Sequence, residues 1–71
     1  MKRWILEQQP ATMSEPQLCT AVLSLAAAVR AAGLGGQEEL VKERQRRLFL
    51  VCVEIEHRMS GQGYDQGVES R

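Results

Sequence analysis

The stretch RQRRLFLVCVEIEH, residues 44–57, decides between a helical fold and a sheet. Its six consecutive apolar residues, 48–53, fit a buried strand or a buried helix equally well, because an unbroken apolar run has no period. The flanks favour the helix, since residues 37–47 (QEELVKERQRR) are nearly all strong helix formers and no Gly or Pro occurs in residues 37–60. A strand would need a turn signal near Arg47, and none is present. We therefore expect one helix over residues 37–60.

A second set of signals predicts a helix over residues 14–33. Ser14 and Gln17 have the spacing of a capping box, in which each side chain bonds the backbone N–H of the other residue. At the other end, Gly33 suits the left-handed position that ends a helix, with Leu34 folding back onto the last turn. The start and the end of this helix are thus both marked in the sequence.

Joined by a turn at residues 34–36, the two helices predict an all-α fold, an antiparallel two-helix hairpin over residues 14–60. Residues 1–13 form an N-terminal arm, and residues 61–71 form a flexible polar tail. Each helix carries an apolar stripe that would face the other. The expected stripes are Leu18, Val22, Leu25 and Val29 on the first helix, and Val41, Leu48, Cys52, Ile55 and Met59, widened by Leu40 and Val51, on the second.

A chain of 71 residues is too short for a hairpin to bury enough apolar surface alone. Phe49, Leu50 and Val53 point away from the expected stripe, so they are left for a further contact. We expect a second copy to cover them, giving a homodimeric four-helix bundle. The alternative is a monomer in which the N-terminal arm folds over these residues, with Trp4 and Ile5 as the lid.

Composition restricts the function classes. Nine basic and nine acidic residues cancel, whereas a dedicated DNA-binding domain normally has a basic surplus. Two cysteines, Cys19 and Cys52, are too few for a secreted disulfide scaffold, and we expect free thiols in the cytoplasm. Arg30 interrupts the apolar run of residues 18–32 before it reaches the length of a membrane span, so we expect no membrane insertion.

No catalytic constellation stands out. The sequence lacks paired carboxylates at a useful spacing, a Ser-His-Asp set and a Gly-rich phosphate loop, so we expect no enzyme, no catalytic residue and no small-molecule substrate. Cys19, Cys52 and His57 do not have the spacing of a metal site, and we expect neither a metal nor a cofactor. His57 fits a cation near a helix C-terminus.

The surplus apolar surface predicts a small protein-binding regulator, inhibitor or adaptor that occludes or bridges a partner protein. Arg outnumbers Lys seven to two, a composition typical of GC-rich bacteria, where phages, plasmids and secretion systems encode such regulators. The expected interface residues are the apolar Trp4, Leu23, Phe49, Leu50 and Val53, with Arg44, Arg46 and Arg47 at the rim.

The alternative function is RNA or DNA binding by a helical dimer through the basic stretch KERQRR, residues 42–47, in which Lys42 and the arginines would contact phosphates. In layout, two helices, a short turn and a polar tail, the chain resembles the plasmid copy-control Rop proteins, which implies a dimer of hairpins that binds RNA. No sequence motif is shared, and no residue role is transferred.

Overall fold

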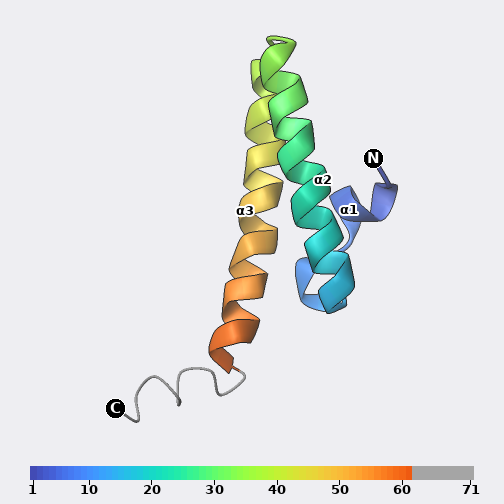
Figure 1. The fold of residues 1–71 in the computed structure, drawn as a ribbon, viewed down its shortest axis with the longest axis vertical. Coiled ribbons are helices and arrows are strands. Elements are labelled where there is room, and N and C mark those ends of the chain that lie inside the picture. The colour runs from blue at the N-terminus through green and yellow to red at the C-terminus, as the bar shows by residue number, and fades with distance from the viewer. Residues whose placement is uncertain (62–71) are drawn as a thin grey trace.

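The computed structural model describes residues 1–61 and contains no strand among them, so the helical interpretation of residues 44–57 is confirmed. In chain order the elements are the short helix α1 (Arg3–Glu7), the 3-10 turn η1 (Pro10–Thr12) and the long helices α2 (Glu15–Leu34) and α3 (Glu38–Gly61). Helices α2 and α3 run antiparallel and side by side (Figure 1). The predicted all-α class and helical hairpin are therefore confirmed. Of the tail predicted over residues 61–71, Gly61 ends α3 and the rest lies outside the described residues.

The start of α2 is fixed by the capping box that the sequence predicts. The Ser14 hydroxyl accepts a hydrogen bond from the Gln17 backbone N–H at 3.2 Å, and the Gln17 side-chain oxygen accepts one from the Ser14 N–H at 2.9 Å. Met13, before the cap, and Leu18, in the first turns of the helix, are both buried in the core. The cap therefore sets both the first turn of α2 and the direction in which the arm leaves it.

The end of α2 corrects the prediction at Gly33. The helix continues through Gly33, and the left-handed residue is Gly36, with φ of 73°. The Gln37 N–H bonds the Ala32 carbonyl at 2.9 Å and the Gly36 N–H bonds the Gly33 carbonyl at 3.2 Å, which is the pattern of a Schellman motif. A glycine inside a helix costs only about 1 kcal/mol, so Gly33 does not force an end. Leu34 remains 85% exposed and does not fold back.

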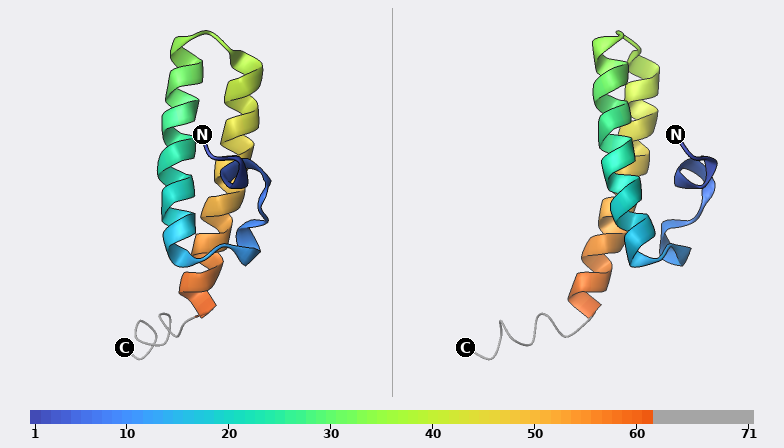
Figure 2. Two further views of the ribbon diagram at one scale, coloured as in Figure 1. Left: turned by 90° about the vertical axis from the view of Figure 1, so that its right-hand side faces the viewer. Right: turned by 45° about the vertical axis from the view of Figure 1, so that its right-hand side comes forward.

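The N-terminal arm lies on one face of the hairpin and runs from the start of α2 to α1, which lies at about half the height of the helix pair (Figure 2). Ile5 and Met13 are almost completely buried and belong to one core cluster with Val51 of α3 and with Leu18, Ala21 and Leu25 of α2. The alternative that the arm covers Phe49, Leu50 and Val53 is therefore wrong. The arm does dock on the hairpin, but its Ile5 side chain packs beside Val51, in the core between the two helices.

The most buried side of α3 differs from the centre of the expected stripe. Val51, expected at the margin, has 0% exposure, whereas Cys52 and Met59, expected at the centre, are exposed. The expectation considered two helices only, so it placed the stripe opposite α2. Because the arm adds a third apolar surface, the most buried position of α3 is the one that faces α2 and the arm together.

Replacing Ile5 tests whether the arm belongs to the core. We expect Ile5→Ala to lower the free energy of unfolding by about 2 kcal/mol or more, because it leaves a cavity against Val51. Leu34→Ala is the matched control, and its effect should stay within about 0.5 kcal/mol because Leu34 is exposed. Urea denaturation followed by circular dichroism measures both. Equal, small effects of the two substitutions would show that the arm is not part of the folded unit.

Candidate functional site

Arg47 of α3 binds the backbone of the arm. Its Nε donates to the carbonyl oxygen of Ile5 at 2.9 Å, and its Nη2 donates to the carbonyl oxygen of Gln8. These carbonyls lie in and just after the last turn of α1. At the C-terminal end of so short a helix, no later backbone N–H of the helix is available to bond them. Arg47 thus caps α1 from a helix that lies 39 or more residues away in sequence.

Arg58 makes the corresponding contact at the other end of the arm. Its Nη2 donates to the carbonyl oxygens of Met13 at 2.6 Å and Ala11 at 3.2 Å, while its Nε donates to Glu54 Oε2 at 2.7 Å. The Arg58 and Glu54 side chains are only 23% and 17% exposed, so water screens this ion pair less than a surface pair. Arg58 therefore joins η1 and the start of α2 to α3.

The basic residues of the stretch 42–47 have different environments in the structure. Arg47 is engaged with the arm, and Arg44 is half-buried, with its Nη1 3.4 Å from Glu43 Oε1. Lys42 and Arg46 are exposed. A phosphate-binding surface on residues 42–47 would thus have these two side chains fully available, which is fewer than the nucleic-acid hypothesis assumes.

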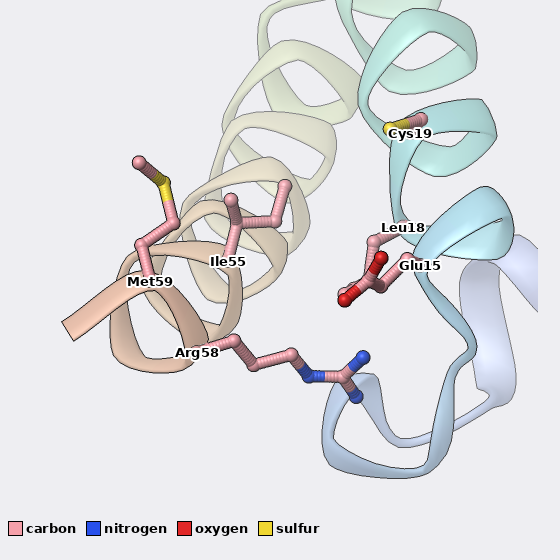
Figure 3. Close-up of a pocket in the computed structure, with 6 residues that line it drawn as sticks. All are labelled: Glu15, Leu18, Cys19, Ile55, Arg58 and Met59. Atoms are coloured by element: carbon pink, nitrogen blue, oxygen red, sulfur yellow. The ribbon is translucent and has the colours of Figure 1, made fainter. Parts of the chain in front are cut away.

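The face of the hairpin opposite the arm contains an apolar groove between α2 and α3. A hollow of about 250 Å³ lies at its open end, where Leu18 and Cys19 of α2 face Ile55 and Met59 of α3 (Figure 3). Glu15 and Arg58 border this end of the hollow. A neighbouring hollow extends the groove along α2. The residues that define the groove are Leu18, Cys19, Val22, Leu23, Ile55 and Met59.

A second apolar surface lies on α3, on the side turned away from α2. Phe49 is 66% exposed, and Leu50 and Val53 are exposed beside it. We call this surface the outer face of α3. Leu23, which is 73% exposed, lies instead at the groove. The structure therefore separates the predicted apolar residues into two surfaces, and it places Trp4 elsewhere again, half-buried against the core.

The sequence analysis did not predict the groove, although it considered most of the residues that form it. Met59 was expected inside the seam between the two helices, and the structure leaves it exposed at the surface. Both cysteines are free and exposed, and within residues 1–61 no three His, Cys, Asp or Glu side chains gather as a metal site would require. What the described residues offer to a ligand is apolar surface with charged margins.

Helix α2 meets the length and hydropathy criteria of a membrane span, with a mean hydropathy of 1.5. Only 22% of the 18-residue window is buried inside the structure, so its apolar character is largely on the surface. Signal sequences and the core helices of soluble proteins meet the same criteria. The exposed apolar side of α2 includes Leu23 at the groove and Leu34 at the turn.

Comparison with protein-family models, with curated proteins and with solved structures finds no match to this chain. Function is therefore inferred from the groove, from the outer face of α3 and from the contacts that frame them.

Removing the two arm-binding guanidinium groups tests their role in the fold. We expect Arg47→Met and Arg58→Met each to lower the free energy of unfolding by about 1.5–3 kcal/mol, because charged donors to partly buried carbonyls are lost. Trp4, the only tryptophan, lies in the arm, so its fluorescence reports arm release separately from helicity. Arg46→Met is the matched control and should change the stability by less than about 0.5 kcal/mol.

Proposed function

We propose that this chain is a small helical protein-binding regulator of the cytoplasm, which acts as a homodimer and occludes or bridges a partner protein. The observation that carries the proposal is the apolar groove opposite the arm, with Leu23 exposed on its margin. Monomeric soluble proteins seldom leave an apolar surface of more than a few hundred Å² uncovered unless it binds something. The protein would catalyse no reaction, because it would work by covering a surface of its partner.

The shape of the groove supports an apolar helix as the partner segment. Two parallel ridges of side chains, Val22 and Leu23 from α2 and Ile55 and Met59 from α3, flank the line along which a third helix would pack. A helix laid in this line would present its apolar residues at intervals of three and four. The arm occupies the opposite face, so it leaves the groove open.

A cytoplasmic location is supported by the charged helix α3, which packs against α2. Helix α2 packs along α3, and α3 carries charged residues from Glu38 to Arg58. A helix of that composition could not accompany α2 into the hydrocarbon core of a membrane at acceptable cost. Arg30 lies within α2 itself and adds to this cost.

A charged substitution in the groove tests the proposal. We expect Leu23→Asp to abolish capture of the partner protein from cells that carry the gene, because it buries an unpaired carboxylate at the contact. Leu34→Asp is the matched control, since Leu34 is as exposed but lies at the turn, outside the groove. Affinity capture with quantitative mass spectrometry compares the two variants with the unchanged chain.

The same experiment separates the alternative functions. A protein captured equally by both variants would remove the groove from the function. Recovery of nucleic acid that is lost steeply with added salt, and that depends on Lys42 and Arg46, would replace the proposal with the nucleic-acid alternative. Recovery of the chain in the membrane fraction would overturn the cytoplasmic location.

A further inference from the structure

The outer face of α3 has a repeating pattern that the groove lacks. Its exposed residues recur at alternating intervals of four and three, which is the spacing of the contact positions in a coiled coil. Phe49 and Val53 occupy the two central positions, and Leu50 borders them. The residues in this line are Lys42, Arg46, Phe49, Val53, Glu56 and Ser60.

The charges along this line are arranged by sign. The N-terminal positions, Lys42 and Arg46, are basic, the centre is apolar, and Glu56 on the C-terminal side is acidic. Within residues 1–61, neither Arg46 nor Glu56 takes part in an ion pair of the chain. A line that is basic at one end and acidic at the other is complementary to the same line running in the opposite direction.

We infer that the outer face of α3 binds the outer face of α3 from a second copy, with the two helices antiparallel. This inference rests on the homodimer proposed above and specifies its contact surface. A two-fold axis at the height of Val51 places Phe49 opposite Val53 of the second copy, and Arg46 opposite Glu56 of the second copy. Each contact occurs twice, as a two-fold interface requires.

Electrostatics selects the direction of the two helices. In a parallel pair, the same residues would face each other, so Arg46 would meet a second Arg46 and Glu56 a second Glu56. Like charges at such positions are destabilising, whereas the antiparallel pair replaces both contacts with opposite charges. The apolar centre is covered in either direction, so the charged residues near the two ends of the line determine which direction is more stable.

The position of the outer face leaves the groove available. Cys52 lies on α3 between the outer face and the groove. The arm reaches only the other margin of the outer face, where Leu6 shares a hollow with Arg46 and Leu50. A second α3 helix on the outer face would therefore leave Leu23 and Met59 exposed for a partner protein. The dimer would present two grooves, which is the arrangement that a bridging protein needs.

Charge reversal tests the inference on the full chain. We expect Arg46→Glu and Glu56→Arg, taken singly, each to weaken the dimer about tenfold at low salt, because each creates two like-charge contacts across the axis. The two single variants mixed together should form a heterodimer, since both contacts then join opposite charges. The double variant should recover self-association. Sedimentation velocity over a range of concentrations measures all four cases.

Two further variants serve as control and as second test. Arg30→Glu changes the same charge on α2, outside the outer face, and should leave the dissociation constant unchanged. Phe49→Ala removes the aromatic residue at the centre of the contact and should weaken the dimer tenfold or more. Circular dichroism confirms that each variant keeps its helices, which is expected because all the altered side chains are exposed.

The outcomes distinguish this inference from the proposal on which it rests. A chain that stays monomeric at every concentration would overturn both the homodimer and the contact surface. A dimer insensitive to the single charge reversals would keep the homodimer and overturn the antiparallel contact. A monomer whose capture of a cellular protein depends on Phe49 would assign the outer face to a foreign partner, and would overturn the inference as well.

Discussion

The structure depends on the burial of Val51 between three parts of the chain. Two antiparallel helices provide only part of its surroundings, and Ile5 and Met13 of the arm complete the cluster with Leu25 of α2. A chain of this size buries only about 60% of the surface that its unfolded form exposes, so each additional covered residue matters. The arm is therefore a structural third layer, and the most buried position of α3 is the one that faces both α2 and the arm.

The basic segment shows how one run of similar residues divides between different roles. In the helix, Arg46 and Arg47 are adjacent in sequence but point about 100° apart. Arg47 reaches the carbonyls of the arm, whereas Arg46 remains in water on the outer face. The arm-binding role depends on backbone oxygens that are more than 35 residues away. The basic run therefore cannot be treated as a single functional patch.

Features set by near neighbours in the sequence could be predicted, and those set by distant contacts could not. The capping box of Ser14 and Gln17 is local, and so is the choice of helix for residues 44–57. The orientation of α3, the burial of Ile5 and the role of Arg47 all depend on where the arm docks, which no periodicity indicates. The prediction that Gly33 ends the first helix was wrong, because the sequence GLGG contains three glycines and the turn needs only one left-handed residue, which is Gly36.

The charges around the two apolar surfaces are arranged differently, and the occupants proposed for the two surfaces differ for that reason. The outer face of α3 is ordered from basic to acidic along one helix, and such an order favours an identical helix in the opposite direction. At the groove, Glu15 and Arg58 border one end together, and Arg58 is already engaged with the arm and Glu54. The groove thus lacks a sign pattern that its own copy would match. In the proposed function, specificity at the groove would come from the shape and the apolar residues of a foreign segment, and the proposed self-association through α3 would leave the groove free to receive one.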